Sequence, residues 1–91
     1  VCALIHDTRY AQPAIFALEV AMATVWSAFI SPSVLLGHSV GEFAAAGVAG
    51  IMSVEAGARL IAERGRLMSE LPSDGIMASM WASDGAVAPL F

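Results

Sequence analysis

A serine lies in the pattern of this chain that is best suited to covalent chemistry. It belongs to the run Gly37-His38-Ser39-Val40-Gly41, which has the form G-x-S-x-G and lies between an apolar stretch and helix-forming residues. In that setting a serine sits on a tight strand-to-helix turn with its hydroxyl projecting. The flanking glycines are needed where backbone comes too close for a Cβ, and the Val40 amide can donate to an oxyanion. The pattern predicts a nucleophile at Ser39; the alternative is a glycine-rich turn with an incidental serine.

A serine nucleophile needs a base, and neither histidine of the chain suits that role. His38 is adjacent to Ser39, and consecutive side chains on such a turn project in different directions. His6 lies in an upstream loop that nothing in the sequence brings near the serine. We therefore expect His38 to be a packed neighbour of the turn, His6 to be a surface loop residue, and the base to lie outside these 91 residues.

Arg64 is the second candidate, because it is the odd charge on the apolar face of a predicted helix. At about 100° per residue, its face holds small and apolar residues: Gly57, Leu60, Ile61, Met68 and Leu71. The other charged residues of the helix lie on the opposite face: Glu55, Arg59, Glu63, Arg66 and Glu70. A buried guanidinium is costly without an anion. Its partner is either Glu42, in a structural ion pair, or a ligand carboxylate, which arginine binds bidentately.

The longest predicted helix runs from about residue 13 to residue 29 and ends before Pro32. Pro13 is placed in its first turn, where the missing N–H costs nothing. The 19-residue run 13–31 holds one charge, Glu19, and its length would suit a bilayer. We favour a buried helix over a membrane span, because Glu19 would lie in the hydrocarbon and no Lys or Arg closely flanks the run.

Two more helices and two strands complete the predicted order. The helices cover about 40–48 and about 53–70, the second with Ser53 as its N-cap. The apolar runs 33–36 and 76–81 are expected to be short strands, the first of them buried in a parallel sheet. The order helix, strand, helix, helix, strand indicates an α/β fold.

The composition indicates the interior of something larger. Apolar residues make up 58% of the chain and charged residues 13%, about half the roughly 25% that is typical of soluble domains. A small domain exposes much of its surface and should be rich in charge. Because the chain also begins without Met and ends without a capping pattern, we expect it to be a fragment.

Charge and cysteine content exclude several classes of function. A net charge of −4 with only four Lys and Arg residues excludes a basic surface that would bind nucleic acid. The single cysteine excludes a disulfide framework and a cysteine-rich zinc site. With no signal peptide indicated, we expect a reducing, cytoplasmic setting and no bound metal.

Three segments together resemble a known family. They are Tyr10-Ala11-Gln12-Pro13-Ala14, Gly37-His38-Ser39-Val40-Gly41-Glu42 and Arg64-Gly65-Arg66-Leu67-Met68. In their order and spacing they resemble the acyltransferase domains of type I modular polyketide synthases. They are also similar to the related malonyl-CoA:acyl-carrier-protein transacylases of fatty-acid synthesis. The match runs through almost the whole chain, and three motifs are more specific than one.

The resemblance implies a ping-pong acyl transfer. Ser39 would take a malonyl-type extender unit from its CoA thioester and pass it to the phosphopantetheine thiol of an acyl carrier protein. Arg64 falls at the family position that pairs with the malonyl carboxylate, and Gln12 matches a glutamine beside the active site. Val40 resembles malonyl-type sequences, whereas methylmalonyl-type ones usually carry Gln there. The implied partners are malonyl-CoA, a carrier-protein domain and neighbouring synthase domains such as a ketosynthase, with no bound cofactor.

The resemblance also implies a fold and its missing parts. The family has a hydrolase-like α/β large subdomain with an inserted ferredoxin-like small subdomain. Residues 1–74 would belong to the former, and residues 75–91 would be the entry into the latter. The family's Gly-Gln-Gly segment, which supplies the second oxyanion amide, would precede Val1, and its catalytic histidine would follow Phe91. The chain alone is therefore expected to be inactive.

Two other functions are compatible with parts of the sequence. A serine hydrolase, such as an esterase or thioesterase, uses the same G-x-S-x-G turn but has no need of an inward-facing arginine. A degenerate segment that acts only as scaffold between synthase domains is disfavoured, because the serine, both glycines and the arginine are all present.

Overall fold

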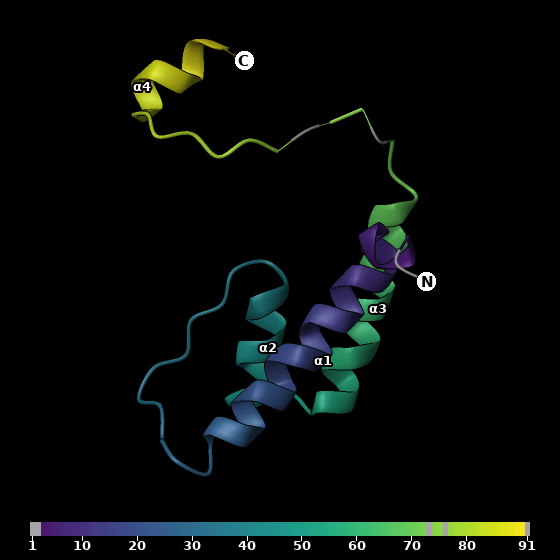
Figure 1. The fold of residues 1–91 in the computed structure, drawn as a ribbon, viewed down its shortest axis with the longest axis vertical. Coiled ribbons are helices and arrows are strands. Elements are labelled where there is room, and N and C mark those ends of the chain that lie inside the picture. Colours follow the sequence, from purple (N-terminus) through teal and green to yellow (C-terminus); the bar gives the residue numbers. More distant parts are fainter. Residues whose placement is uncertain (1–2, 73, 76, 91) are drawn as a thin grey trace.

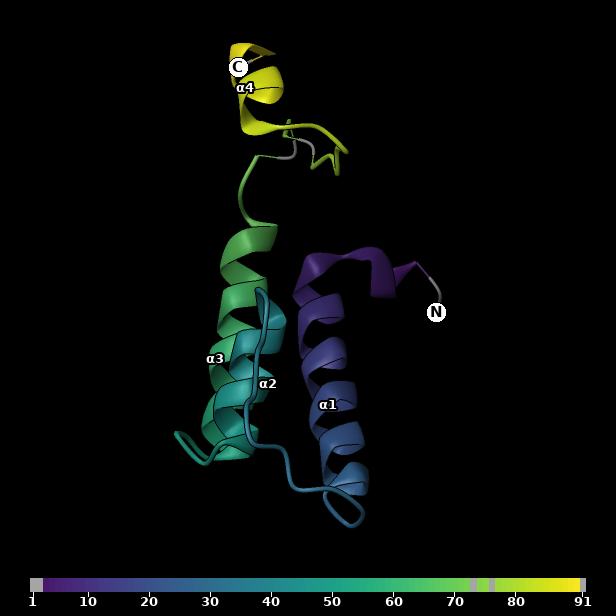
Figure 2. The ribbon, with the colours of Figure 1, turned by 90° about the vertical axis from the view of Figure 1, so that its left-hand side faces the viewer.

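The computed structural model describes residues 3–72, 74, 75 and 77–90, and within them the chain is helical. The elements, in chain order, are the 3₁₀-helix η1 (Leu4–His6), α1 (Thr8–Trp26), α2 (Val40–Val48), α3 (Val54–Ser69), α4 (Asp84–Val87) and the 3₁₀-helix η2 (Ala88–Leu90). Helices α1, α2 and α3 pack together, whereas α4 lies apart from them (Figure 1). Figure 2 shows that α3 runs antiparallel to both α1 and α2.

Helix α1 begins earlier than the sequence predicts. Asp7 is its N-cap, and the Asp7 carboxylate accepts a 2.9 Å hydrogen bond from the Arg9 amide. This bond satisfies one of the first free N–H groups, so the helix starts at Thr8 rather than near residue 13. Pro13 therefore lies inside α1 instead of in its first turn, and the helix ends at Trp26 rather than at residue 29.

The close approach of α1 and α3 is made possible by Gly65. A Cβ added there would lie 3.0 Å from the Thr8 carbonyl oxygen and 3.2 Å from the Arg9 carbonyl oxygen. Pro13 has no N–H to offer the Arg9 carbonyl four residues before it. That carbonyl instead faces the bare Cα of Gly65, and the two helices pack backbone to backbone beside Arg64.

The core of the three helices is small and mixed in origin. Its buried apolar residues are Phe16 from α1, Val40 and Ala44 from α2, and Ile61 from α3. Ile61 is fully buried. Gly57 makes room for the Phe16 ring, because a Cβ at Gly57 would lie 2.7 Å from the Phe16 Cζ atom. Val40, the residue that follows Ser39, belongs to this core, so the start of α2 is packed against residues of α1 and α3.

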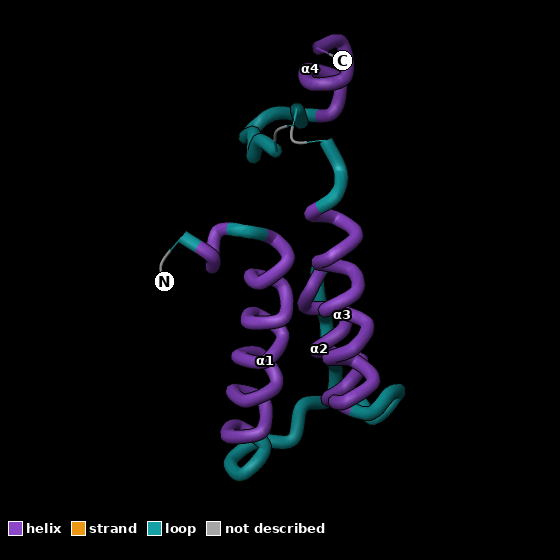
Figure 3. The backbone as a smooth tube through the Cα atoms, turned by 90° about the vertical axis from the view of Figure 1, so that its right-hand side faces the viewer, coloured by secondary structure: helices purple, strands orange, loops and turns teal. Residues whose placement is uncertain are grey.

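The two predicted strands are not formed in the residues that the structure describes. The segment 33–36 is a loop, in which Val34 and Leu36 are 82% and 95% exposed (Figure 3). Residues 77–80 are also irregular, and Ile76 falls outside the described residues. A strand needs a neighbouring strand for its backbone N–H and C=O groups. The described residues form no strand that could pair with either segment. The structure therefore leaves the α/β prediction unconfirmed.

The other two predicted helices are confirmed. Helix α2 covers Val40–Val48 as expected, and α3 covers Val54–Ser69 with Ser53 accepting a 3.1 Å hydrogen bond from the Ala56 amide. None of the described helices combines the length and the apolar character that a bilayer crossing needs. Helix α4 was not predicted, and its only described neighbour is η2.

Candidate active site

Ser39 occupies a strained backbone conformation at the start of α2. Its φ is 54° and its ψ is −115°, and it is the one non-glycine residue with positive φ in the described part of the chain. Such a conformation costs on the order of 1–3 kcal/mol in a residue with a Cβ. The Ser39 side chain makes no capping bond to α2, and its hydroxyl instead accepts a hydrogen bond from Arg64 of α3. This is the geometry predicted for the serine of a sharp turn into a helix.

Gly37 is required by the shape of that turn. A Cβ at Gly37 would lie 2.2 Å from both the carbonyl carbon and the carbonyl oxygen of Gly41, an impossible approach to backbone atoms. This confirms the expected close approach at Gly37. The same expectation is wrong for Gly41, where an added Cβ would meet only the Glu19 Oε1 atom, at 3.5 Å. The backbone of Gly41 is what crowds Gly37, and the structure leaves room for a side chain at Gly41 itself.

We expect Gly37→Ala to destabilise the turn in the protein that contains this chain. The new Cβ can be accommodated only if the turn opens, at a cost of about 2 kcal/mol or more. The matched control is Gly47→Ala in α2, where a Cβ meets nothing within 4 Å and alanine favours the helix. Thermal melts should therefore place Gly37→Ala below the wild type and Gly47→Ala at or above it. Equal melting temperatures for the two variants would contradict this account of the turn.

Arg64 extends from α3 to the serine. Its Nη2 atom donates a 3.0 Å hydrogen bond to the Ser39 hydroxyl oxygen, and its Nη1 atom donates to the Gln12 side-chain oxygen. Its guanidinium carbon lies 5.9 Å from the centre of the Phe43 ring, a cation–π distance. The structure thus brings Ser39, Gln12 and Arg64 together from three different helices or their ends.

Gln12 is buried at 5% exposure between α1 and α3. Its Nε2 atom donates to the Thr8 hydroxyl at 2.7 Å and to the Met68 sulfur at 3.2 Å. With the bond from Arg64, every polar atom of this amide has a partner. The family resemblance places Gln12 beside the active site; the alternative is that it only belongs to the start of a helix. In the structure, Gln12 lies against Arg64.

The structural ion pair between Glu42 and Arg64 is not formed. None of the ion pairs formed among the described residues involves Arg64, and its described hydrogen-bond acceptors, Gln12 and Ser39, are neutral. Arg66, by contrast, donates to Glu63 and to Glu70 on the outer face of α3. The hydrogen bonds with Glu63 and then Glu70 raise the pKa of Arg66, and the bond from Arg66 lowers the pKa of Glu63. The ion pairs on the outer face of α3 therefore engage Arg66, whereas Arg64 forms no ion pair among the described residues.

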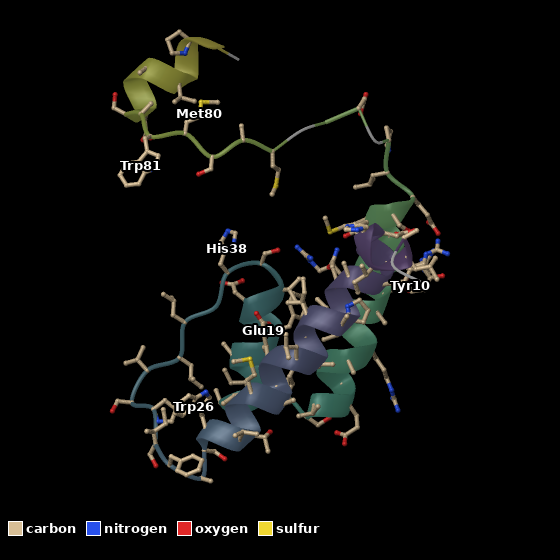
Figure 4. The ribbon with its side chains drawn as sticks, viewed as in Figure 1. Tyr10, Glu19, Trp26, His38, Met80 and Trp81 are labelled. Atoms are coloured by element: carbon tan, nitrogen blue, oxygen red, sulfur yellow. The ribbon has the colours of Figure 1, made fainter. Side chains whose placement is uncertain are left out.

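Neither histidine approaches the serine hydroxyl with a hydrogen bond in the described part of the chain. His38 is exposed and points away from the three helices (Figure 4). His6 is exposed in η1. His38 is therefore not the packed neighbour that the sequence suggested, and His6 is at the surface as expected, although in a 3₁₀-helix rather than a loop.

Val40, the candidate oxyanion donor, is the first residue of α2 and is buried at 9% exposure. Its amide has no acceptor among the described residues, whereas the next two amides bond to the carbonyls of His38 and Ser39. The free N–H groups at a helix start are ready-made donors to an anion.

The sequence reasoning gave three residues no role at the site: Thr8, Phe43 and Met68. Each has a helical spacing that could have indicated it. Thr8 precedes Gln12 by four residues, Phe43 follows Ser39 by four, and Met68 follows Arg64 by four. Glu19 is a further neighbour of the turn: its Oε2 atom is buried with no hydrogen-bond partner among the described residues (Figure 4).

Comparison with known proteins defines the class. The family model described as "Acyl transferase domain" matches residues 3–87. Since this match covers most of the chain, the chain belongs to the acyl transferase domain family. No solved structure matches it.

The relatives with the most similar sequences include polyketide synthases of fungi and bacteria. The chain is 48% identical over 89 residues to the PKS-NRPS hybrid synthetase acdB of Aspergillus candidus, covering 97% of this chain and 4% of that protein. It is 46% identical over 88 residues to the mycoketide-CoA synthase of Mycobacterium tuberculosis, covering 96% and 2%. It is 50% identical over 84 residues to polyketide synthase GfsB of Streptomyces halstedii, covering 91% and 2%. The chain thus spans only a few per cent of the length of these relatives.

Proposed function

We propose that this chain is part of an acyltransferase domain that loads a malonyl-type extender unit onto an acyl carrier protein in polyketide synthesis. The acyl group would come from malonyl-CoA and pass through an ester on Ser39 to the phosphopantetheine thiol of the carrier. Membership of the acyl transferase family and the similarity to polyketide synthases support the reaction class. The cytoplasmic setting and the neighbouring ketosynthase belong to the same proposal.

The observation that carries the choice of substrate is the 3.0 Å contact between Arg64 Nη2 and Ser39 Oγ. In a malonyl ester only one methylene separates the ester carbonyl from the free carboxylate. A guanidinium that reaches the serine oxygen therefore also reaches the carboxylate of a malonyl group attached to it. Arginine presents five N–H donors, of which the described contacts use two. The remaining donors can bind the carboxylate bidentately.

The chemistry assigns one task to each residue. Ser39 Oγ attacks the thioester carbonyl, its proton passes to a base, and the CoA thiol leaves with a proton as the acyl-serine ester forms. The Val40 amide donates to the oxyanion of each tetrahedral intermediate. The thiol of the carrier protein then attacks the ester carbonyl, and Ser39 regains its proton as the alcohol leaves. Arg64 holds the malonyl carboxylate throughout, with the N–H donors that its bonds to Gln12 and Ser39 leave free.

We also propose where this chain belongs in the fold of the complete acyltransferase domain. Residues 1–74 would belong to a hydrolase-like α/β subdomain, in which the exposed apolar segment 33–36 pairs with strands from outside this chain. Residues 75–91 would lead into a ferredoxin-like subdomain. A histidine base and a second oxyanion amide would also come from outside the chain, as the family resemblance implies. Exposure of Val34 and Leu36 supports this, because a parallel strand of such a sheet is normally buried.

The test is to incubate the intact protein that carries this chain with labelled malonyl-CoA and then with carrier protein. We expect mass spectrometry to find a malonyl group on the Ser39 peptide, and label to move to the phosphopantetheine thiol when the carrier is added. Release of free malonate without transfer would instead indicate a serine hydrolase. Absence of both acyl-enzyme and hydrolysis would indicate an inactive scaffold.

A further inference from the structure

Gln12 lies between a donor and an acceptor that fix which way its amide faces. Its oxygen accepts from Arg64 Nη1, and its nitrogen donates to Met68 Sδ at 3.2 Å and to Thr8 Oγ1 at 2.7 Å. Arg64 and Met68 lie one helical turn apart on α3, whereas Thr8 and Gln12 lie one turn apart on α1. The Gln12 amide therefore bridges α1 and α3 at the point where the Arg64 side chain extends from α3.

The chemistry of these neighbours allows one orientation of the amide. An amide oxygen and an amide nitrogen have nearly the same shape, so only hydrogen-bond partners distinguish them. The Thr8 hydroxyl both donates and accepts, and therefore fits either orientation. A guanidinium only donates and a thioether only accepts. Turning the Gln12 amide over would set its NH₂ group against the Arg64 cation and its oxygen against the Met68 sulfur.

We propose that Met68 is a positioning residue for the recognition of the acyl carboxylate. Its sulfur, together with Thr8, holds the Gln12 oxygen toward Arg64, and Gln12 in turn holds the guanidinium within reach of Ser39. This inference rests on the proposed function, because it assigns Met68 a part in distinguishing malonyl from acetyl groups. Without the sulfur acceptor, the amide loses one of the contacts that hold its oxygen toward Arg64. The guanidinium is then held less firmly within reach of the acyl group.

The test is Met68→Leu in the complete acyltransferase, which keeps the volume of the side chain and removes its acceptor. We expect kcat/KM for malonyl loading to fall about three- to tenfold, the worth of one neutral hydrogen bond. Acetyl loading should be unchanged, because an acetyl group carries no carboxylate for Arg64. The matched control is Met52→Leu, since Met52 lies beside Gly57 and is not among the described hydrogen-bond partners of Gln12. Its malonyl-to-acetyl ratio should equal that of the wild type.

A double-mutant cycle separates positioning from packing. In a Gln12→Ala background the amide is gone, so Met68→Leu should cause no further fall in the malonyl-to-acetyl ratio. An equal fall in both backgrounds would overturn the proposal, and so would an unchanged ratio in Met68→Leu alone. A wild type that forms no acyl-serine at all would overturn the proposed function and this inference with it. A wild type that prefers malonyl, together with an insensitive Met68→Leu variant, would overturn this inference alone.

Discussion

Ser39→Ala in the intact protein is expected to abolish covalent loading from malonyl-CoA and to leave the fold in place. The hydroxyl is the proposed nucleophile, and removal of a nucleophile lowers the rate by about 10⁴-fold or more. The side chain makes no capping bond to α2, so its loss costs the fold little beyond one exposed hydrogen bond from Arg64. Mass spectrometry of the Ser39 peptide measures loading, and a thermal melt measures the fold.

The matched control is Ser53→Ala, which should have the opposite pattern. Ser53 is the N-cap of α3, and its hydroxyl accepts from the Ala56 amide at 3.1 Å. Removing a cap costs about 1 kcal/mol of stability. This variant should therefore melt at a lower temperature and still load malonyl at the wild-type level. Normal loading by Ser39→Ala would refute the nucleophile assignment, whereas loss of loading by both variants would point to a shared structural effect.

Features that depend on nearby residues were predicted from the sequence. The bounds of α2 and α3 follow from Ser53, the glycines and Pro72, which act within one or two turns of the residues they affect. The turn at Ser39 follows from Gly37 in the same way, because the clash that excludes a Cβ there is with Gly41, four residues on. The face of α3 that carries Arg64 follows from helical periodicity alone.

Features that depend on distant residues were misplaced, left unconfirmed or not predicted. The start of α1 was misplaced because Pro13 suits a first turn, while the cost of placing it inside the helix depends on how its freed carbonyl is packed. That carbonyl lies against Gly65, which is remote in sequence. The strand expected at 33–36 needs a neighbouring strand, and its apolar pattern says nothing about where that strand is. The contact between Gln12 and Met68 also crosses two helices, and no local spacing shows which residues will meet.

Arg64→Ala is expected to change which acyl group is loaded. In the proposed mechanism malonyl supplies an anion for the guanidinium, whereas acetyl leaves the arginine partly buried without one. Losing a charge-assisted bidentate contact costs on the order of 2–5 kcal/mol, or roughly 30- to several-thousand-fold in the rate of malonyl loading. Acetyl loading should fall far less, so the malonyl-to-acetyl ratio should collapse. Loading rates from malonyl-, methylmalonyl- and acetyl-CoA, measured on variant and wild type, provide the comparison.

Two control variants show whether the change in acyl-group preference is specific to Arg64. Arg59→Ala removes an exposed charge from the outer face of the same helix and should leave the ratio unchanged. Arg64→Lys keeps the charge but not the fork of donors, so it should retain only part of the preference. If Arg64 only holds Gln12 and Ser39 in place, Arg64→Ala will lower the loading rates of all acyl groups about equally. The malonyl-to-acetyl ratio would then be unchanged, and that result would rule out carboxylate recognition by Arg64. A wild type that prefers methylmalonyl would overturn only the inference that Val40 marks a malonyl-type domain. The role of Arg64 would stand, because both extender units carry the same free carboxylate.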